Sequence, residues 1–249
     1  MRRQGQVGGF LVLSSFQSTR GGWIMEYIRS EGDFARRGPR ISPTKHAVKR
    51  SLDIVFSLVL LFLLAPLMAI IALLIMWRDG GGAIFAHERV GRGGDRFGCL
   101  KFRTMVKDAD VQLARLLRDD PSVRAEWDAN QKLKDDPRIL KGIGHVLRAT
   151  SLDELPQLWN VLMGHMSLVG PRPVVEAELQ RYGTACSLYL SVRPGLTGPW
   201  QIGERSNGSY DSRVSEDSAY IQNWTLSQDV AIIFRTAMMV LRGRAPGAY

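Results

Sequence analysis

The longest apolar run in the chain lies between residues 54 and 77, where all 24 positions are uncharged. That length suits a helix that crosses a bilayer. Pro66 lies near the centre, where its ring and its missing N–H interrupt helical hydrogen bonding. The flanking parts, of 12 and 11 residues, each reach about 17 to 18 Å, roughly half of a hydrocarbon core. Two structures stay open: a spanning helix, and a re-entrant helix that breaks at Pro66 and returns.

Basic residues flank this run on both sides. They are Lys45, Lys49 and Arg50 before it, and Arg78, Arg89 and Arg92 after it. Because Lys and Arg gather on the cytoplasmic side of a membrane, the symmetry gives no clear inside and outside. It is consistent with both ends on the cytoplasmic side, as a re-entrant helix requires.

Short apolar runs between Gly-rich turns at 83–104 predict a hairpin or two short strands. A helix should follow, because apolar residues recur there at spacings of three and four until Pro121. These residues are Val106, Ala109, Leu113, Leu116 and Leu117. Such a stripe faces a core or, beside a membrane anchor, lies in the interface.

The second half of the chain predicts further helices and shaped loops. Residues 125–150 have a helical pattern that becomes irregular around the sequence DDPR, and residues 174–190 predict another helix. Residues 193–203 (RPGLTGPWQIG) are too rich in Gly and Pro for a regular element. A last helix begins near Thr225, which forms a capping-box pattern with Gln228. The predicted fold is mostly α with a small β element.

Charge is concentrated at the N-terminus. Residues 1–50 hold ten Lys/Arg against three Asp/Glu, so they carry +7 of the net charge of +9. Beside an apolar segment, such an arm is better explained by anionic lipid than by nucleic acid, and we expect no nucleic-acid partner. Three parts are predicted: a flexible basic arm at 1–44, a membrane segment at 45–80 and a folded domain at 81–249.

The densest group of candidate reactive side chains lies in the segment SLDELPQLWN, at 151–160. Adjacent carboxylates on a helix point about 100° apart, so Asp153 and Glu154 can divide labour. One would bind a metal or attack phosphorus, and the other would support it or move protons. A structural interpretation competes, because Ser151 and Glu154 have capping-box spacing. It leaves Asp153 unassigned, in a first turn where the helix dipole would keep it ionised.

Arg172 lies between Pro171 and Pro173, which restrict the backbone on both sides. A stiffened guanidinium suits bidentate capture of phosphate, although a surface arginine in a rigid turn has the same pattern. Further cations that could serve a diphosphate are Lys101, Arg103, Arg138, Arg148, Arg193 and Arg205. The two cysteines form no CxxC pair and the four histidines lack metal-ligand spacing, which argues against zinc.

Six ordered segments resemble the bacterial sugar transferase family of small monotopic phosphoglycosyl transferases. They are KFRTM, DDPRI, SLDELPQLWNVL, MSLVGPRP, VRPGLTGPWQ and the closing GAY. The resemblance runs from about Lys45 to Tyr249. Within the family, the chain is most similar to the exopolysaccharide-production type, which acts as an undecaprenyl-phosphate galactose or glucose phosphotransferase.

The resemblance implies a ping-pong transfer of hexose-1-phosphate from a UDP-sugar to undecaprenyl phosphate, with galactose or glucose as the hexose. The phosphosugar would be carried covalently on Asp153. Mg²⁺ would lie near Asp153, with Glu154 as the supporting carboxylate. The implied or candidate phosphate ligands are Arg172, Arg148, Lys101, Arg103 and Arg205.

The resemblance also implies a re-entrant helix broken at Pro66 and a cytosolic phosphoglycosyl transferase domain with interfacial amphipathic helices. The domain would lie on the cytoplasmic face of the bacterial inner membrane, and the lipid bilayer would be a partner. Oligomeric state stays open, a homo-oligomer included. The alternative function is a catalytically inactive membrane scaffold in a polysaccharide assembly complex.

Overall fold

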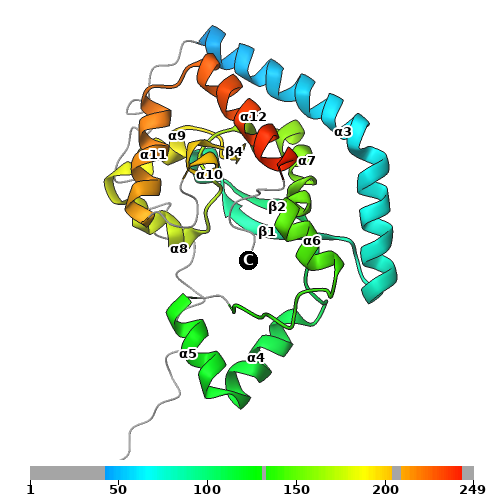
Figure 1. The fold of residues 1–249 in the computed structure, drawn as a ribbon. Coiled ribbons are helices and arrows are strands. Elements are labelled where there is room, and N and C mark those ends of the chain that lie inside the picture. The colour runs from blue at the N-terminus through cyan, green and yellow to red at the C-terminus, as the bar shows by residue number, and fades with distance from the viewer. Residues whose placement is uncertain (1–42, 131–132, 204–208, 243–249) are drawn as a thin grey trace, which may run out of the picture.

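The computed structural model describes residues 43–130, 133–203 and 209–242. The predicted basic arm, 1–44, lies outside these ranges except for its last two positions, which begin the first helix. The described part is mostly helical and has two small two-stranded sheets (Figure 1). The prediction of a mostly α fold with a small β element is confirmed.

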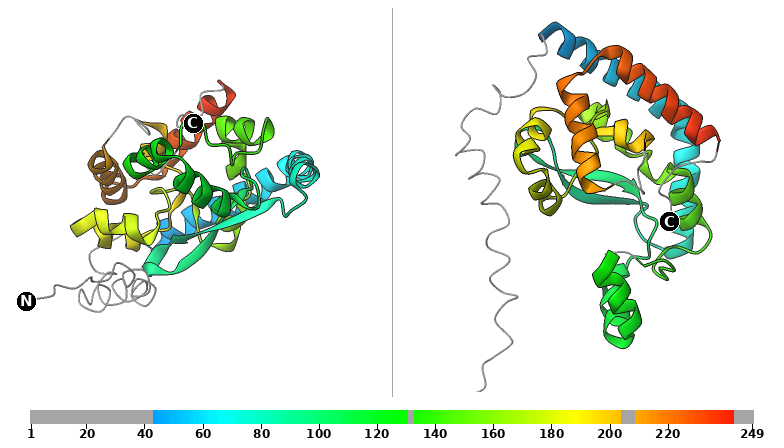
Figure 2. Two further views of the ribbon diagram at one scale, coloured as in Figure 1. Left: turned by 90° about the horizontal axis from the view of Figure 1, so that it is seen from below. Right: turned by 60° about the vertical axis from the view of Figure 1, so that its left-hand side comes forward.

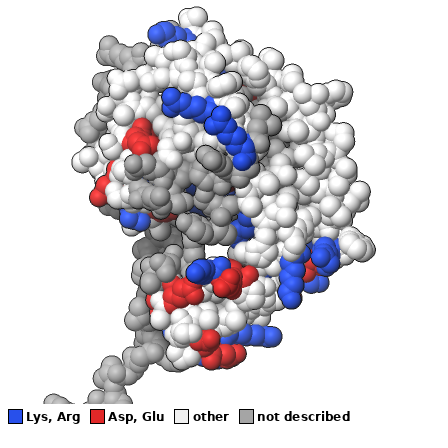
Figure 3. All heavy atoms as spheres, in the orientation of Figure 1, with Lys and Arg blue, Asp and Glu red and all other residues white. Residues whose placement is uncertain are grey.

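Helix α3, Pro43–Asp79, contains the whole apolar run and is 37 residues long. Pro66 lies inside α3 and does not end it, and α3 is one bent helix (Figure 1). Proline kinks a helix by removing one hydrogen bond and crowding the preceding turn. Among the described residues, α3 is the helix that is long and apolar enough to cross a membrane, and 11% of its most apolar window is buried. The surface over α3 is uncharged between its two ends (Figure 3).

The predicted hairpin is confirmed. Strands β1, Ile84–Val90, and β2, Arg96–Phe102, pair antiparallel, with Ile84 opposite Phe102 and Val90 opposite Arg96. The turn between them contains the 3-10 segment η1, Arg92–Gly94. Two of its residues are glycines at positive φ, which other residue types rarely adopt.

A second sheet was not predicted. Strand β3, Ser167–Val169, pairs in parallel with β4, Gly195–Thr197. The segment 193–203, predicted to be an irregular loop, therefore contains β4 and a short helix α10, Pro199–Ile202. A Cβ on Gly195 would lie 2.1 Å from the Gly170 nitrogen, so glycine is required for these backbones to approach.

Two further helices follow the sequence pattern. Helix α4, Ala109–Asp119, ends just before Pro121 as predicted, and α5, Pro121–Asn130, packs on it away from the body (Figures 1 and 2). The capping box predicted at Thr225 is formed at the start of α12, Leu226–Leu241. The single helix predicted at 174–190 was wrong, because the chain kinks at Gly183 (φ 48°). The remaining elements are α6 (Ile143–Thr150), η2 (Leu152–Glu154), α7 (Gln157–Met163), α8 (Glu176–Leu179), η3 (Gln180–Ala185), α9 (Cys186–Ser191) and α11 (Tyr210–Gln222).

The largest core cluster lies between β2, α7, β3 and α11. Phe97, Leu158, Val161, Val169 and Ile221 are buried there. Because these elements come from three separated parts of the chain, 96–102, 157–169 and 210–222, the core fixes their relative positions. Of the functional side chains described below, Lys101 extends from β2, while Asp153 and Glu154 lie just before α7 and Arg172 just after β3.

Both ends of α3 contact this folded body. Near its start, Arg50 donates to two carbonyls near the end of α7, at 2.6 and 2.8 Å. Near its end, Asp79 accepts a hydrogen bond from Arg103 at 2.7 Å, and Ile75 is completely buried in a cluster with β2 and α6. The first part of α3 also lies beside α12 (Figures 1 and 2), where Lys49 and Asp229 form an ion pair.

Candidate functional site

Asp153 and Glu154 lie in the short turn η2, between α6 and α7. Ser151, just before it, adopts a left-handed conformation with φ 57°, the one positive φ among the described residues other than glycine. Its side chain makes no capping hydrogen bond, so the capping-box interpretation of Ser151 and Glu154 was wrong. A residue in this sparsely populated region is found where the surrounding structure imposes it, often at functional sites.

Glu154 is bound by a cation from a distant strand. Lys101 of β2 donates from Nζ to Glu154 Oε1 at 2.7 Å, and the same Nζ lies 3.9 Å from Asp153 Oδ2. Asn160 of α7 fixes this approach, because its side-chain amide binds two main-chain groups of β2 at 2.8 and 2.9 Å. The predicted carboxylate pair therefore shares one lysine. The buried Asn160 amide fixes the position of β2 relative to α7, and so the position of Lys101 relative to the carboxylates.

Burial dominates the electrostatics of Asp153. Its side chain is 14% exposed, and desolvation raises its pKa to about 6. Lys101 and, more weakly, Arg148 lower this pKa, while Glu154 raises it. The sequence had predicted that a helix dipole would keep Asp153 ionised, but a three-residue turn provides little dipole and burial acts the other way. At pH 7 the carboxylate is still mostly ionised, and it has lost much of its hydration.

Arg172 follows β3, between its two prolines. Its Nη1 lies 4.0 Å from Glu154 Oε1, and the side chain is 38% exposed, which leaves donors directed at solvent. The position of Arg172 is fixed by more than the two neighbouring prolines. Its carbonyl accepts a hydrogen bond from Arg213 Nη2 at 3.2 Å, and Asp217 lies 3.8 Å from the Arg213 Nε.

A buried tyrosine also positions this loop. The Tyr189 hydroxyl donates to the Val90 carbonyl at 2.8 Å and accepts from the Val174 N–H at 3.2 Å. It thereby joins the end of β1 to the residue that follows the Pro171–Pro173 segment. Neither Tyr189 nor Arg213 was singled out from the sequence, because nothing local distinguishes them from other core residues.

A small cavity lies beside these side chains, with about 250 Å³ of empty space that includes its open mouth. Lys101, Arg172 and Arg89 bring positive charge to it from β2, the loop after β3 and β1. The full lining is Arg89, Cys99, Lys101, Glu154, Gln157, Arg172, Pro173 and Gln201.

Arg89 was missed as a site residue. Burial is the main cause that lowers the pKa of its guanidinium, and its Nη1 lies 3.6 Å from Glu178 Oε2. A signal for it was present in the sequence. Phe85 of β1 lies opposite Lys101 of β2, and Arg89 lies four residues after Phe85 in β1. The side chains of Arg89 and Lys101 therefore share one face of the hairpin.

The other predicted phosphate ligands are distributed unevenly. Arg148 lies in the last turn of α6, close enough to Asp153 to lower its pKa. Arg103 is not in the cavity lining; its side chain pairs with Asp79 at the end of α3. Arg205 lies outside the described residues. The structure thus brings Lys101, Arg172 and Arg148 to the carboxylate pair and places Arg103 elsewhere.

Within the described ranges, no group of three or more His, Cys, Asp or Glu side chains could hold a metal ion. Asp153 and Glu154 provide two carboxylates beside a cavity with cationic walls. Magnesium commonly takes one or two protein carboxylates and completes its shell with water and substrate phosphate. The donor set therefore fits Mg²⁺ that arrives together with a phosphorylated substrate.

The sequence profile of the family described as "Bacterial sugar transferase" matches residues 44–243. The chain is 52% identical over 202 residues to the "UDP-galactose-lipid carrier transferase" of Erwinia amylovora, covering 81% of this chain and 42% of that protein. It is 49% identical over 226 residues to the "Undecaprenyl-phosphate galactose phosphotransferase" of Salmonella typhimurium, covering 89% and 44%. It is 46% identical over 209 residues to the "Exopolysaccharide production protein ExoY" of Rhizobium meliloti, covering 84% and 91%. The chain thus spans less than half of the first two relatives and most of the third.

Proposed function

This chain belongs to the bacterial sugar transferase family, and on that premise we propose that it moves a hexose-1-phosphate from a UDP-sugar to undecaprenyl phosphate. This step would initiate exopolysaccharide synthesis. The observation that carries the proposal is a desolvated aspartate, Asp153, beside a cavity with cationic walls. The hexose is galactose or glucose, and galactose is favoured by the names of the Erwinia and Salmonella relatives.

In the first half of the reaction, an Asp153 carboxylate oxygen attacks the β-phosphorus of the UDP-sugar. The bond between this phosphorus and the bridging oxygen breaks, and the bridging oxygen leaves with UMP. The hexose-1-phosphate stays on Asp153 as an acyl phosphate. In the second half, an oxygen of undecaprenyl phosphate attacks the same phosphorus, the bond to Asp153 breaks, and the carboxylate is restored.

The cations make the approach of two anions feasible. Phosphoryl transfer depends mainly on positioning and on neutralising charge. Lys101 lies close to both carboxylates and can turn toward a phosphate, while Arg89 and Arg172 line the same cavity. Glu154 orients Lys101 and thus acts as a supporting carboxylate.

We propose Mg²⁺ as the cofactor, held by Asp153 with Glu154 in support. When bound, the ion would neutralise negative charge on the diphosphate. The same two carboxylates supply the hard oxygen ligands that it prefers.

We also propose that α3 is re-entrant. A straight helix of 37 residues would separate its ends by about 55 Å, yet both ends of α3 contact one folded body. The bent middle is apolar and exposed, as shown by Phe62 (81%), Leu63 (64%) and Leu73 (62%). Insertion of this bend into one leaflet would cover it while keeping both ends and the catalytic domain on the cytoplasmic face of the inner membrane.

Helix α12 supports the same placement. Its Val230 and Phe234 are 60% and 66% exposed, although the helix begins beside the start of α3. An exposed apolar face on a helix next to a membrane anchor suits the bilayer interface. We therefore propose α12 as an interfacial amphipathic helix.

The test uses the full chain in nanodiscs with Mg²⁺ and UDP-galactose, UDP-glucose or UDP-N-acetylglucosamine. Without acceptor, we expect about one equivalent of UMP and a hexose-phosphate mass on the peptide that contains Asp153. Added undecaprenyl phosphate should then give continuous UMP release. Asp153→Asn should form no adduct, whereas Asp128→Asn, which changes an exposed carboxylate on α5, should behave as the wild type.

Two results would overturn parts of the proposal. An adduct on another side chain would refute Asp153 as the nucleophile. Absence of UMP release with every UDP-sugar, from protein shown to be folded, would favour the alternative of an inactive membrane scaffold.

A further inference from the structure

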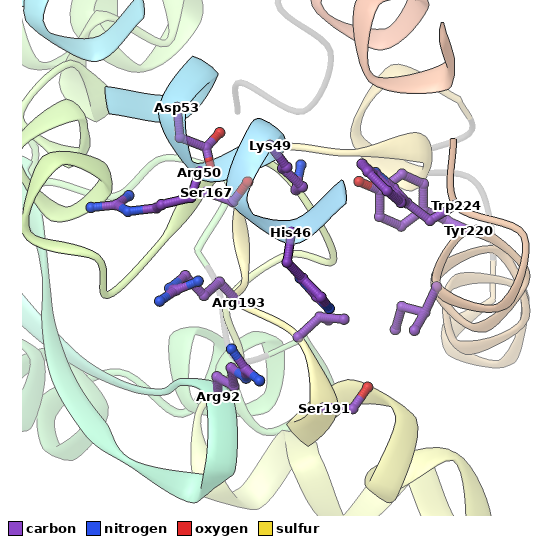
Figure 4. A pocket seen from close by; sticks show the side chains of 12 residues that line it. His46, Lys49, Arg50, Asp53, Arg92, Ser167, Ser191, Arg193, Tyr220 and Trp224 are labelled. Atoms are coloured by element: carbon purple, nitrogen blue, oxygen red, sulfur yellow. The ribbon is translucent and has the colours of Figure 1, made fainter. Parts of the chain in front are cut away.

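A second cavity lies at the start of α3, and we call it the interfacial cavity. It has about 510 Å³ of empty space that includes its open mouth. Its basic lining consists of His46, Lys49, Arg50, Arg92 and Arg193. Figure 4 shows His46, Arg92 and Arg193 in neighbouring positions on α3, the hairpin turn and the segment before β4, with the Arg193 guanidinium extending away from His46.

This lining has an excess of positive charge. Among the described residues that line the cavity, Asp53 is the one carboxylate, against the four permanent cations of Lys49 and three arginines. Asp229, outside the lining, offsets Lys49 through an ion pair at 2.5 Å. Two uncompensated positive charges remain, so the cavity is suited to an anion.

Carbonyl groups at the end of α7 explain why two of the three arginines lie in this cavity, but they do not explain the third. Arg50 donates to two carbonyls there, and Arg193 Nε donates to the Gly164 carbonyl at 2.7 Å. Carbonyls at a helix C-terminus favour cations, so these two arginines have a structural role. Arg92 belongs to the exposed hairpin turn and has no part in it. Its guanidinium and the free end of Arg193 are available to a ligand.

The arginines also repel one another. Burial lowers the pKa of Arg193, and the charges of Arg50 and Arg92 lower it further. A cluster of like charges in a partly desolvated cavity costs free energy unless an anion lies among them. A phosphate oxygen is the anion that guanidinium groups bind best.

The position of the cavity indicates where such a phosphate would come from. His46, Lys49 and Arg50 precede the apolar run by about one or two helical turns, and Trp224 lines the cavity just before the exposed apolar face of α12. Tryptophan and basic side chains at the end of an apolar helix are typical of headgroup depth. The lining shares no residue with the cavity beside Asp153, so this is a separate site.

We propose that the interfacial cavity binds the phosphate of an anionic phospholipid headgroup and so holds the start of α3 at the membrane surface. The inference rests on the proposed membrane placement of α3 and is independent of sugar transfer. Free inorganic phosphate shares the chemistry of the ligand, and the experiment separates the two sources.

The experiment measures thermal unfolding of the purified full chain in a neutral detergent. Three probes are titrated: dihexanoyl phosphatidylglycerol, dihexanoyl phosphatidylcholine and inorganic phosphate. We expect a saturable rise in Tm with phosphatidylglycerol and a much smaller rise with the other two. Arg92→Gln should raise the apparent Kd for phosphatidylglycerol roughly tenfold, as expected for loss of one charge-assisted hydrogen bond.

Lys45→Gln is the matched control, because Lys45 is exposed at the same end of α3 and does not line the cavity. It should leave the apparent Kd near the wild-type value. Equal stabilisation by inorganic phosphate would overturn the lipid assignment while retaining a phosphate site. Equal effects of Arg92→Gln and Lys45→Gln, or no saturable stabilisation by any probe, would overturn the site itself. Because the readout is binding, a failure here is distinguishable from a lack of transferase activity.

Discussion

Replacing Asp153 by asparagine should stabilise the protein at neutral pH while abolishing its proposed reaction. The amide has nearly the same shape as the carboxylate but carries no charge. Asp153 is desolvated in the turn η2, and the attraction of Lys101 does not fully offset that cost, since the pKa of Asp153 is raised. The charge is therefore retained at the expense of stability, as is common for reactive groups.

The magnitude follows from the pKa. A rise from 3.8 to about 6, at about 1.4 kcal/mol per pKa unit, makes the ionised carboxylate about 3 kcal/mol less stable in the folded protein than in the unfolded chain. Since the folded pKa is the higher one, the stability that the protein has with a protonated Asp153 is fully present below pH 3.8. It is lost as the pH rises through about 6. Asparagine does not titrate, so the variant should gain about 2 kcal/mol relative to the wild type between pH 4.5 and 7.5.

Thermal unfolding of both proteins in the same detergent, without nucleotide or Mg²⁺, measures this difference. For a chain of this size, about 2 kcal/mol corresponds to a relative shift in Tm of roughly 4 to 8 °C. The Tm difference between the exposed Asp128→Asn variant and the wild type should be the same at pH 4.5 and at pH 7.5. A pH-independent Tm difference for Asp153→Asn would refute the conclusion that burial of this carboxylate dominates its energetics.

Three further changes test other parts of the structure. Lys101→Met removes the cation shared by the carboxylates, so the rate of adduct formation should fall by at least tenfold, and the pH at which this rate rises should move above about 6. An unchanged profile of UMP release against pH would exclude this role of Lys101. Tyr189→Phe leaves two buried main-chain groups without their hydroxyl partner and should cost about 1 to 3 kcal/mol, seen as a lower Tm. Pro66→Ala should let α3 straighten, moving cysteines placed before the helix to periplasmic reagents; an unaltered labelling pattern would argue against a proline-dependent bend.

Local patterns determined much of this protein. Gly-rich turns between short apolar runs produced the hairpin, and the stripe that ends before Pro121 produced α4. The capping box at Thr225 formed because both partners lie within one turn of each other. Asp153, Glu154 and Arg172 were singled out from residue type and spacing, and the structure brings them to one place.

Contacts between distant residues decided the rest. Glu154 had a local partner available in Ser151, yet it binds Lys101, 53 positions away, because the hairpin is fixed on α7 by Asn160. Arg103 belongs to the motif beside Lys101 but pairs with Asp79 of α3. Neither outcome follows from local spacing.

The sequence by itself specified which residue types carry the proposed chemistry, which segment is apolar and where the local turns and caps form. The tertiary structure decided the raised pKa of Asp153, the pairing of β3 with β4 and the basic lining of the interfacial cavity. The physical reason is that helical periodicity, caps and turns depend on neighbours within a few residues. Desolvation, strand pairing and charge clustering depend on which distant segments the core brings into contact.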